Sequence, residues 1–217
     1  MKLFLDTAHL DDIRAWAYMI DGVTTNPSHL AKENNDPKKQ VLEICSAMAK
    51  KDVSVEITYT EPTAVYQQAL ALAKLAPNIV VKIPCHHDYY PVISQLVRDG
   101  VRINVTLVFT LVQSLFMCKL GATYISPFIG RWDDIDIDGT NLLFEIRSMI
   151  DQYDYDTQIL AASIRHIRHL HETILAGADV ATLPPSVLEK SSNHILTKEG
   201  MEQFNTDWNK LGYPSFP

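Results

Sequence analysis

The sequence predicts a single (β/α)8 barrel with one extra helix at its C-terminal end. Short β-branched or apolar runs alternate with segments of helical spacing, giving about eight strand–helix units of roughly 25 residues each. A doubly wound open sheet is the competing architecture, but it usually has about five or six strands and a glycine-rich fingerprint. No such fingerprint follows any strand here, which favours the barrel. We expect one domain over residues 1–217, with the extra helix at 197–211.

The first half of the chain contains half of these units. Each starts with an apolar or β-branched run and continues into a segment whose apolar residues recur at helical spacing. Pro37 stands at the first position of one expected helix, which suits its missing N–H, and Gly100 stops another. The expected strands are 2–7, 22–26, 53–59 and 78–84, and the expected helices are 9–20, 37–50, 62–75 and 88–100.

The second half repeats the alternation and then adds the extra helix. Gly121 closes one of its helices. The extra helix carries Phe204, Trp208 and Leu211 at helical spacing, so it has an apolar stripe to bury. The expected strands are 101–109, 122–129, 157–164 and 179–185, and the expected helices are 110–121, 140–150, 165–177, 186–193 and 197–211.

Composition and charge exclude several classes of function. The net charge of −7 and the pI near 5.5 argue against broad binding to nucleic acid or to an anionic membrane. No apolar run reaches the roughly 18 residues of a membrane span, and the acidic N-terminal segment lacks the features of a signal peptide. Cys45, Cys85 and Cys118 show no CxxC spacing, which indicates reduced thiols and predicts a cytoplasmic location.

Polar residues recur near the C-terminal ends of the expected strands. In a (β/α)8 barrel these ends build the active-site face. Any one polar residue there could be a hydrogen-bonded core group with no further role. A charged or hydroxyl residue at the same end of almost every strand instead predicts an active site. These residues are Asp6, Thr25, Asn26, Glu56, Lys82, Asn104, Thr106, Ser126 and Ser163.

Lys82 is the most unusual of these residues. It lies in the run NIVVKIP (78–84), which reads as a strand buried on both faces. Lysine is almost never fully buried unless it is paired, because desolvating an ammonium is costly. Burial disfavours the ammonium form, so a free amine becomes available, and such an amine attacks a ketone or aldehyde to form a Schiff base.

A Schiff-base reaction also needs groups that move protons. Asp6 and Glu56 are carboxylates on other strands, and the hydroxyl of Thr106 could hold a water between Glu56 and the intermediate. The alternative is that Lys82 forms a buried ion pair with Asp6 or Glu56 and performs no chemistry. The sequence leaves both interpretations open.

Basic residues surround the start of the seventh expected helix. Ser163, Arg165, His166 and Arg168 lie around its first turn, where the helix dipole disfavours cations. A bound phosphate would resolve this conflict, and phosphate sites in these barrels often follow strands seven and eight. Arg131, after strand six, could supply a second guanidinium. The alternative is a basic helix face exposed to solvent.

Two patterns resemble metal sites, but we predict no metal. His166 and His169 are spaced like helical metal ligands, yet the sequence shows no suitably placed carboxylate. The segment DIDIDGTNLLFE (134–145) fits the calcium-binding EF-hand pattern letter for letter. It follows a strand rather than a helix, so we expect the acidic loop 133–138 to be a solvated connection.

Together these residues make the chain resemble the transaldolase family, in its short-chain branch that includes the fructose-6-phosphate aldolases. The resemblance covers essentially the whole chain and implies a (β/α)8 barrel. Its most specific motifs are GVTTNPS and VVKIP, and the supporting ones are FLDTA, NVTLVF, ISPFIGRWDD and AASIR.

The resemblance implies a role for each site residue. Lys82 would form the Schiff base with a ketose phosphate, and Asp6 would transfer the proton at the C4 hydroxyl of this donor. Glu56 and Thr106 would position the catalytic water. The dihydroxyacetone portion or the Schiff-base intermediate would bind to Asn26, Asn104 and Ser126, and the phosphate to Arg131, Ser163 and Arg165.

The implied reaction moves a dihydroxyacetone unit between sugar phosphates. Sedoheptulose 7-phosphate and glyceraldehyde 3-phosphate would give erythrose 4-phosphate and fructose 6-phosphate, with no metal or organic cofactor. Glu56 and Phe128 match the transaldolase pattern, whereas the aldolase branch has glutamine and tyrosine there. The alternatives are a fructose-6-phosphate aldolase, another class I sugar-phosphate aldolase, or a non-catalytic binding protein. The resemblance also implies a homo-oligomer, a pentamer or decamer.

Overall fold

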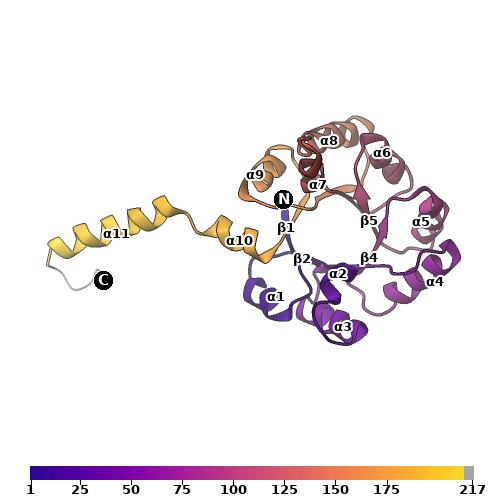
Figure 1. The fold of residues 1–217 in the computed structure, drawn as a ribbon, viewed down its shortest axis with the longest axis horizontal. Coiled ribbons are helices and arrows are strands. Elements are labelled where there is room, and N and C mark those ends of the chain that lie inside the picture. The colour runs from indigo at the N-terminus through magenta and orange to yellow at the C-terminus, as the bar shows by residue number, and fades with distance from the viewer. Residues whose placement is uncertain (213–217) are drawn as a thin grey trace.

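The computed structural model describes residues 1–212 and contains a closed barrel of parallel strands, β1 to β8 in chain order (Figure 1). The expected fold class is therefore confirmed. Every strand pairs with its neighbours in the sequence, and β1 closes the barrel by pairing with β8. The strands are β1 (Lys2–Asp6), β2 (Gly22–Thr24), β3 (Asp52–Glu56), β4 (Ile79–Pro84), β5 (Ile103–Val108), β6 (Tyr124–Pro127), β7 (Gln158–Ala161) and β8 (Val180–Leu183).

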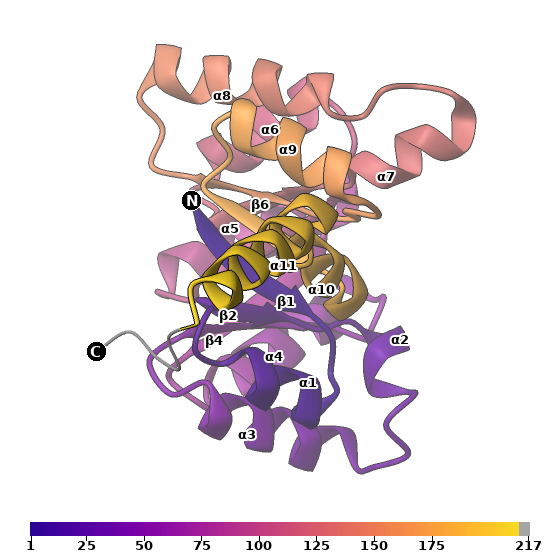
Figure 2. The same ribbon diagram turned by 90° about the vertical axis from the view of Figure 1, so that its left-hand side faces the viewer.

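Helices form a ring around the barrel, except for the last one, which projects from it (Figure 1). The longer ones are α1 (Leu10–Trp16), α3 (Pro37–Ala47), α4 (Pro62–Ala73), α5 (Tyr90–Arg98), α6 (Leu111–Lys119), α8 (Asn141–Tyr153), α9 (Ile167–Leu175), α10 (Pro185–Ser192) and α11 (Ile195–Lys210). Short helical turns that the sequence did not predict are α2 (Pro27–Leu30), η1 (His87–Tyr89), α7 (Ile129–Trp132) and η2 (Asp133–Ile135). In Figure 2, α2 and α7 lie at the same end of the barrel, opposite the end where the chain starts.

Several strands and helices are shorter than the sequence predicts. The third strand ends at Glu56 rather than at residue 59, because the backbone N–H groups of Thr58 and Tyr59 donate to Gln68 Oε1 instead of continuing the ladder. Helix α9 begins at Ile167 with His166 as its N-cap, so Ser163 and Arg165 lie in the loop before the helix. The β-branched residues after Glu56 make the predicted strand longer than the observed one. The observed strand ends where the Gln68 side chain accepts the backbone hydrogen bonds instead of a neighbouring strand.

Alternation along the strands divides the barrel interior into an apolar and a polar layer. Phe4, Val80 and Tyr124 lie inside the barrel and belong to one small buried cluster. Two residues further along the same strands stand Asp6, Lys82 and Ser126. Because side chains at i and i+2 face the same side of a strand, the apolar layer carries the polar layer directly above it. The remaining cluster members are Leu160, Ala162 and Val180.

The strand register sets the level of the polar residues. Glu56 of β3 pairs with Lys82 of β4, and Lys82 pairs with Asn104 of β5. These three side chains therefore reach the interior at one height. Beyond Asn104 the pairing of β5 with β6 shifts, with Leu107 at a φ of 57°. This bulge redirects the end of β5.

Helix α11 extends away from the barrel (Figure 1). It starts two residues before the expected helix, at Ile195 rather than residue 197, and ends at Lys210 rather than residue 211. None of its residues is buried. None of the helices within residues 1–212 is both long and apolar enough to cross a membrane.

Candidate active site

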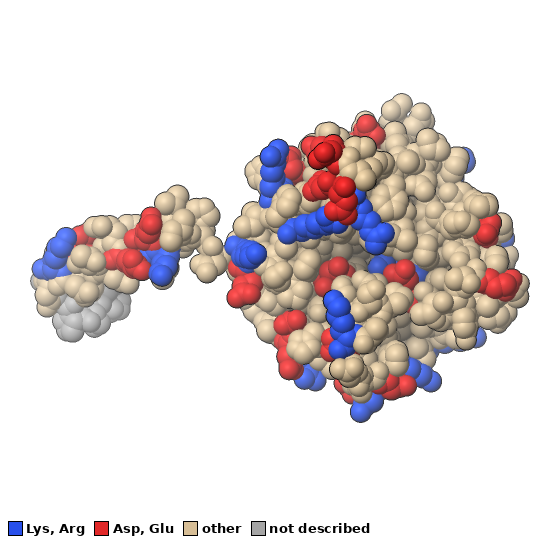
Figure 3. Space-filling model, viewed as in Figure 1, with Lys and Arg blue, Asp and Glu red and all other residues tan. Residues whose placement is uncertain are grey.

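A cavity of about 280 Å³ opens at the C-terminal ends of the strands. Most of the predicted site residues line it, and Figure 3 shows acidic and basic side chains around the hollow at the centre of the barrel. Its volume is close to the lower end of the range of about 300 to 1,000 Å³ for small-molecule sites. The lining residues are Asp6, Thr24, Asn26, Lys82, Ser126, Phe128, Arg131, Leu160, Ala162, Ser163, Arg165 and Thr182.

Lys82 lies at the bottom of this cavity and is 5% exposed. Its Nζ lies 3.0 Å from Glu56 Oε2 and donates to the carbonyl oxygen of Thr25 over 3.2 Å. The buried ion pair that the sequence allowed is therefore present, with Glu56 rather than Asp6. The pair satisfies the charge of Lys82 and places a carboxylate within direct proton-transfer distance of the amine.

Asp6 is held by hydroxyl groups on two neighbouring strands. Thr24 Oγ1 lies 2.7 Å from Asp6 Oδ1 and 2.6 Å from Thr182 Oγ1. Because Thr24 donates to Asp6, Thr182 donates in turn to Thr24. His29 Nδ1 approaches Asp6 Oδ1 to 3.8 Å. Sequence reasoning missed Thr24, His29 and Thr182, although Thr182 stands at the end of an expected strand like the residues it selected.

Asn26 and Thr25 both use their side chains to hold the loop after β2. Asn26 Oδ1 accepts from the backbone N–H of His29 and caps α2, while its Nδ2 lies 3.3 Å from His29 Nδ1. Thr25 Oγ1 donates to the carbonyl oxygen of Ser54. The amide of Asn26 reaches the cavity, and the hydroxyl of Thr25 does not.

A chain of hydrogen bonds runs through the wall of the cavity from β6 to β3. Ser126 Oγ donates to Asn104 Oδ1 over 2.6 Å, and Asn104 Nδ2 donates to Ser54 Oγ over 3.1 Å. Ser126 lines the cavity, whereas Asn104 is fully buried behind it. Asn104 thus orients Ser126 and fills the space next to Lys82.

Thr106 is buried, and its hydroxyl has no hydrogen-bond partner within the described part of the chain. Buried hydroxyl groups are usually paired, so an orphan hydroxyl of this kind calls for an explanation. It lies on β5 at the level of Pro84, two residues beyond Lys82 on β4.

The wall of the cavity after β6 combines an aromatic ring with two guanidinium groups. The guanidinium carbon of Arg131 lies 5.2 Å from the centre of the Phe128 ring, a cation–π distance. Phe109 packs edge-on against Phe128. Arg165 reaches the same cavity from the loop after β7. Two cations near one wall indicate an anionic ligand.

Ser163 and Arg165 both line the cavity and lie in the loop before α9. Ser163 has a φ of 60°, a left-handed conformation that costs a non-glycine residue about 1 to 3 kcal/mol and occurs often at ligand sites. Arg168, which the sequence placed beside them, points away and lies 3.6 Å from Glu172. Of the basic residues around the start of α9, Arg165 therefore reaches the cavity and Arg168 faces solvent.

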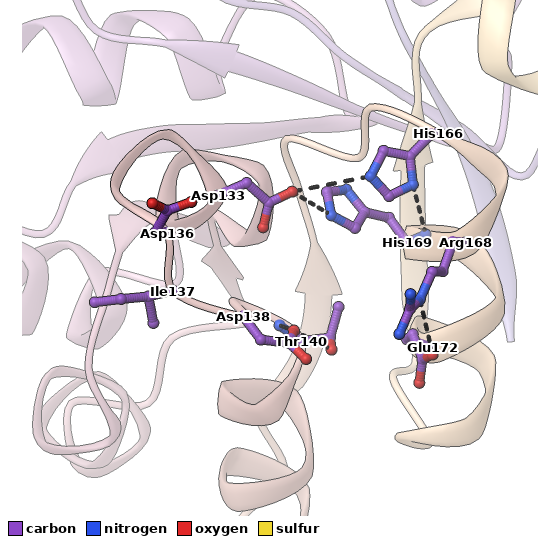
Figure 4. A pocket seen from close by; sticks show the side chains of 9 residues that line it. All are labelled: Asp133, Asp136, Ile137, Asp138, Thr140, His166, Arg168, His169 and Glu172. Carbon is purple, nitrogen blue, oxygen red and sulfur yellow. Dashed lines mark hydrogen bonds and ion pairs between the residues drawn. The ribbon is translucent and has the colours of Figure 1, made fainter.

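A second pocket, separate from this cavity, is lined by charged residues of the acidic loop and of the segment around α9 (Figure 4). Asp133 Oδ2 lies 2.8 Å from His169 Nε2 and 3.9 Å from His166 Nε2, and the two imidazole rings are 3.7 Å apart. Asp133 is the carboxylate that the sequence did not reveal. Both Nδ1 atoms accept backbone N–H groups, His166 from His169 and His169 from Arg165. The Nε2 atom of His169 therefore carries its proton and donates to Asp133, whereas His166 Nε2 lies too far from Asp133 for a hydrogen bond.

His169 is buried, and this position favours its neutral form. Burial and the neighbouring His166 lower the pKa of His169, and both outweigh the opposing effect of Asp133. Its ring is fixed between the backbone of the loop before α9 and the carboxylate of Asp133.

The acidic loop is more firmly attached than a solvated connection. Both carboxylate oxygens of Asp134 accept from the terminal nitrogens of Arg165, with Oδ2 2.7 Å from Nη2. The guanidinium of Arg165 holds the pKa of Asp134 below its ordinary value. Asp138 Oδ1 accepts from the backbone N–H and the hydroxyl of Thr140, and these bonds lower the pKa of Asp138. Two of the carboxylates in the calcium-like pattern thus already have partners.

The fold and the cavity together define a barrel enzyme whose site contains a buried lysine, two carboxylates and a basic wall. Residues 3–213 match the family model described as Transaldolase/Fructose-6-phosphate aldolase. The chain belongs to this family. This membership and the names of its relatives indicate a transaldolase-type enzyme.

The relatives match along almost the whole chain. A protein named "Probable transaldolase" from Rhizobium meliloti (strain 1021) is 47% identical, over 98% of this chain and 98% of its own. Another protein of that name, from Parabacteroides distasonis, is 46% identical over 97% of this chain and 99% of its own. Among solved structures, a designed cube-shaped protein cage matches 98% of this chain and 79% of its own at 15% identity, with a TM-score of 0.62. This last match concerns the fold alone.

The position of His169 predicts a pH dependence of stability. Its pKa is lowered on folding, so the unfolded chain takes up a proton first as the pH falls below about 6.5. Stability present above that pH is lost as the pH falls towards the folded pKa. We expect His169→Gln, which does not titrate, to show a smaller decrease in melting temperature than the unchanged protein between pH 7.5 and 5.5. His171→Gln, an exposed change on the same helix, is the control, and equal pH slopes for all three proteins would contradict the prediction.

Proposed function

We propose that this protein is a transaldolase that transfers a dihydroxyacetone unit between sugar phosphates through a Schiff base on Lys82. The observation that carries the proposal is the buried contact of 3.0 Å between Lys82 Nζ and Glu56 Oε2 at the bottom of a cavity. The opposite wall of this cavity contains cations suited to a phosphate. The reaction would convert sedoheptulose 7-phosphate and glyceraldehyde 3-phosphate to erythrose 4-phosphate and fructose 6-phosphate.

The first step is attack of Lys82 on the donor ketone. Glu56 accepts a proton from the ammonium, and the neutral amine adds to the carbonyl carbon. The resulting carbinolamine loses water, and Glu56 returns the proton to the leaving hydroxyl group. Thr106 contributes a hydroxyl group without a partner in the described residues, which suits it to bind this water.

The second step breaks the bond between C3 and C4 of the donor. Asp6 accepts the proton of the C4 hydroxyl, the C3–C4 electron pair moves into the iminium, and the aldose phosphate leaves. The hydrogen bond from Thr24 and the chain to Thr182 keep the Asp6 carboxylate oriented. The bound enamine then attacks the acceptor aldehyde, Asp6 returns the proton, and water hydrolyses the new Schiff base.

The other predicted residues bind the two ends of the sugar. Asn26 and Ser126 line the cavity beside Lys82 and would hydrogen-bond the hydroxyl groups of the dihydroxyacetone portion, with Asn104 supporting Ser126. Arg131, Ser163 and Arg165 line the far wall and would bind the phosphate.

Phe128 supports transfer over cleavage. The ring lines the cavity and has no hydroxyl group. A phenol there could deliver a proton to the enamine and release free dihydroxyacetone, which is the aldolase reaction. With phenylalanine the enamine survives until an acceptor arrives, so we place aldolase activity second.

We also propose that the protein is a cytoplasmic homo-oligomer, a pentamer or decamer, in which α11 packs on a neighbouring subunit. Four apolar residues of α11 and Leu211 at its C-cap are between 61% and 75% exposed in the single chain. An apolar stripe of this size on a projecting helix is costly in water unless another surface covers it. These residues are Ile195, Leu196, Met201, Phe204 and Leu211.

Trapping the intermediate tests the Schiff base. With fructose 6-phosphate and borohydride, we expect a reduced adduct on Lys82 in the peptide mass spectrum. Lys82→Met should form no adduct and lower kcat by about 10³-fold or more, as expected for loss of a covalent nucleophile. Lys119→Met, an exposed change on α6, is the control for labelling elsewhere. Normal turnover by Lys82→Met would contradict the mechanism. If the unchanged protein is folded but inactive and forms no adduct, a non-catalytic binding protein is favoured.

Comparing transfer with cleavage tests the choice between the two branches. In coupled assays we expect dihydroxyacetone transfer to be faster than cleavage of fructose 6-phosphate. Phe128→Tyr should raise the cleavage rate relative to the transfer rate by about tenfold or more, since a positioned general acid contributes about 10² to 10⁴. Phe109→Tyr, which changes the neighbouring ring in the same way, is the control. Faster cleavage than transfer by the unchanged protein would reverse the assignment.

Light scattering tests the role of α11. We expect the purified protein to have the mass of five or ten chains and Phe204→Ser combined with Met201→Ser to dissociate it. The exposed change Thr197→Ser on the same helix should leave the mass unchanged. A monomeric mass for the unchanged protein would exclude the oligomer.

A further inference from the structure

Asp134 is the partner of one of the two cavity arginines but does not itself line the cavity. Its carboxylate accepts from both terminal nitrogens of Arg165, an arrangement in which two parallel hydrogen bonds fix the plane of the guanidinium. Asp134 stands in the acidic loop after α7, whereas Arg165 stands before α9. The two segments meet only because β6 and β7 are neighbours in the barrel.

The aliphatic part of Arg165 is restrained by the same loop. A Cβ atom at Gly130 would lie 2.9 Å from Arg165 Nε and 3.0 Å from its Cδ, so the side chain runs directly over this glycine. The same atom would lie 2.2 Å from the carbonyl oxygen of Ser163. The aliphatic part of Arg165 therefore passes over Gly130, and its guanidinium is hydrogen-bonded to Asp134. Both partner residues come from the segment that follows β6.

The contact with Asp134 leaves part of the guanidinium free for a second anion. Arginine has five N–H donors along the edges of a plane. Asp134 occupies the edge formed by Nη1 and Nη2, and the edge that includes Nε remains available to bind another fork of oxygen atoms. A carboxylate and a phosphate can thus bind adjacent edges of the same side chain, each through different N–H groups.

We propose that Asp134 is a positioning residue that fixes Arg165 to receive the phosphate group of the substrate. The inference rests on the proposed function, because it gives Arg165 a phosphate to bind. An unrestrained arginine loses its rotamer freedom only when the ligand binds, which weakens binding, whereas an arginine fixed in advance does not. In the alternative, Asp134 and the phosphate would compete for the guanidinium of Arg165. Removing the charge of Asp134 would then tighten phosphate binding.

The test compares Asp134→Asn with the unchanged full-length protein. Asparagine is nearly the same size but cannot accept the fork of two hydrogen bonds. We expect the KM for fructose 6-phosphate and the Kd for inorganic phosphate, measured by calorimetry, each to rise about threefold to tenfold, the range expected for losing one pre-ordered side chain. We expect kcat to remain within about twofold, because Lys82 and Asp6 are unaffected.

The controls separate positioning from a general structural effect. Asp136→Asn removes a charge from the same loop and should change neither constant. Asp134→Glu keeps the charge and should recover part of the phosphate affinity. The KM for unphosphorylated fructose, measured at high concentration, should be the same in all variants, because its binding does not involve Arg165.

Each outcome decides between this inference and the proposed function. A lower Kd for phosphate in Asp134→Asn would show competition and overturn the inference. Equal constants for Asp134→Asn and the unchanged protein, or equal losses for fructose and fructose 6-phosphate, would overturn it as well while leaving the proposed reaction intact. If the unchanged protein binds no phosphate and does not distinguish the two sugars, both the inference and the phosphate site of the proposed function are wrong.

Discussion

The contact between Lys82 and Glu56 is the constraint on which the rest of the site depends. Both groups lie inside the barrel, and a buried ion pair is tolerated only if its geometry is good and its remaining hydrogen bonds are satisfied. The register of β3 and β4 supplies that geometry by placing both residues at one level, and the carbonyl oxygen of Thr25 accepts a further hydrogen bond from the amine. The pair accommodates a lysine in a strand that is otherwise apolar.

The polar site is stable because an apolar layer closes the barrel below it. Phe4, Val80 and Tyr124 fill the interior one alternation step away from the site, and their burial separates the charged groups from solvent at the other end of the barrel. The period of two along each strand assigns both layers at once. A one-residue shift in any strand would exchange an apolar residue with a polar one, so the register of the sheet and the chemistry of the cavity are specified together.

The barrel and the residues at the strand ends were predictable from the sequence because both follow from local patterns. The contact of Lys82 with Glu56 was one of two possibilities, since a pattern does not give the register between neighbouring strands. Thr24 and Thr182 were not found. Thr24 bonds Asp6 and Thr182 bonds Thr24, and a hydroxyl in a strand looks the same whether it bonds a side chain or the backbone. Pairs such as Asp134 with Arg165, which join distant loops, need the three-dimensional structure.

The acidic segment after β6 directs its first two carboxylates to different partners. Successive residues of a 3₁₀ turn point about 120° apart. Asp133 and Asp134 therefore face different partners, His169 inside the neighbouring helix and Arg165 at the cavity. Consecutive carboxylates of this turn thus diverge rather than converge on one centre. In the anion site that we propose, Asp134 holds Arg165 in place without entering the cavity. Through its contact with Arg165, Asp134 thus belongs to the anion site that we propose.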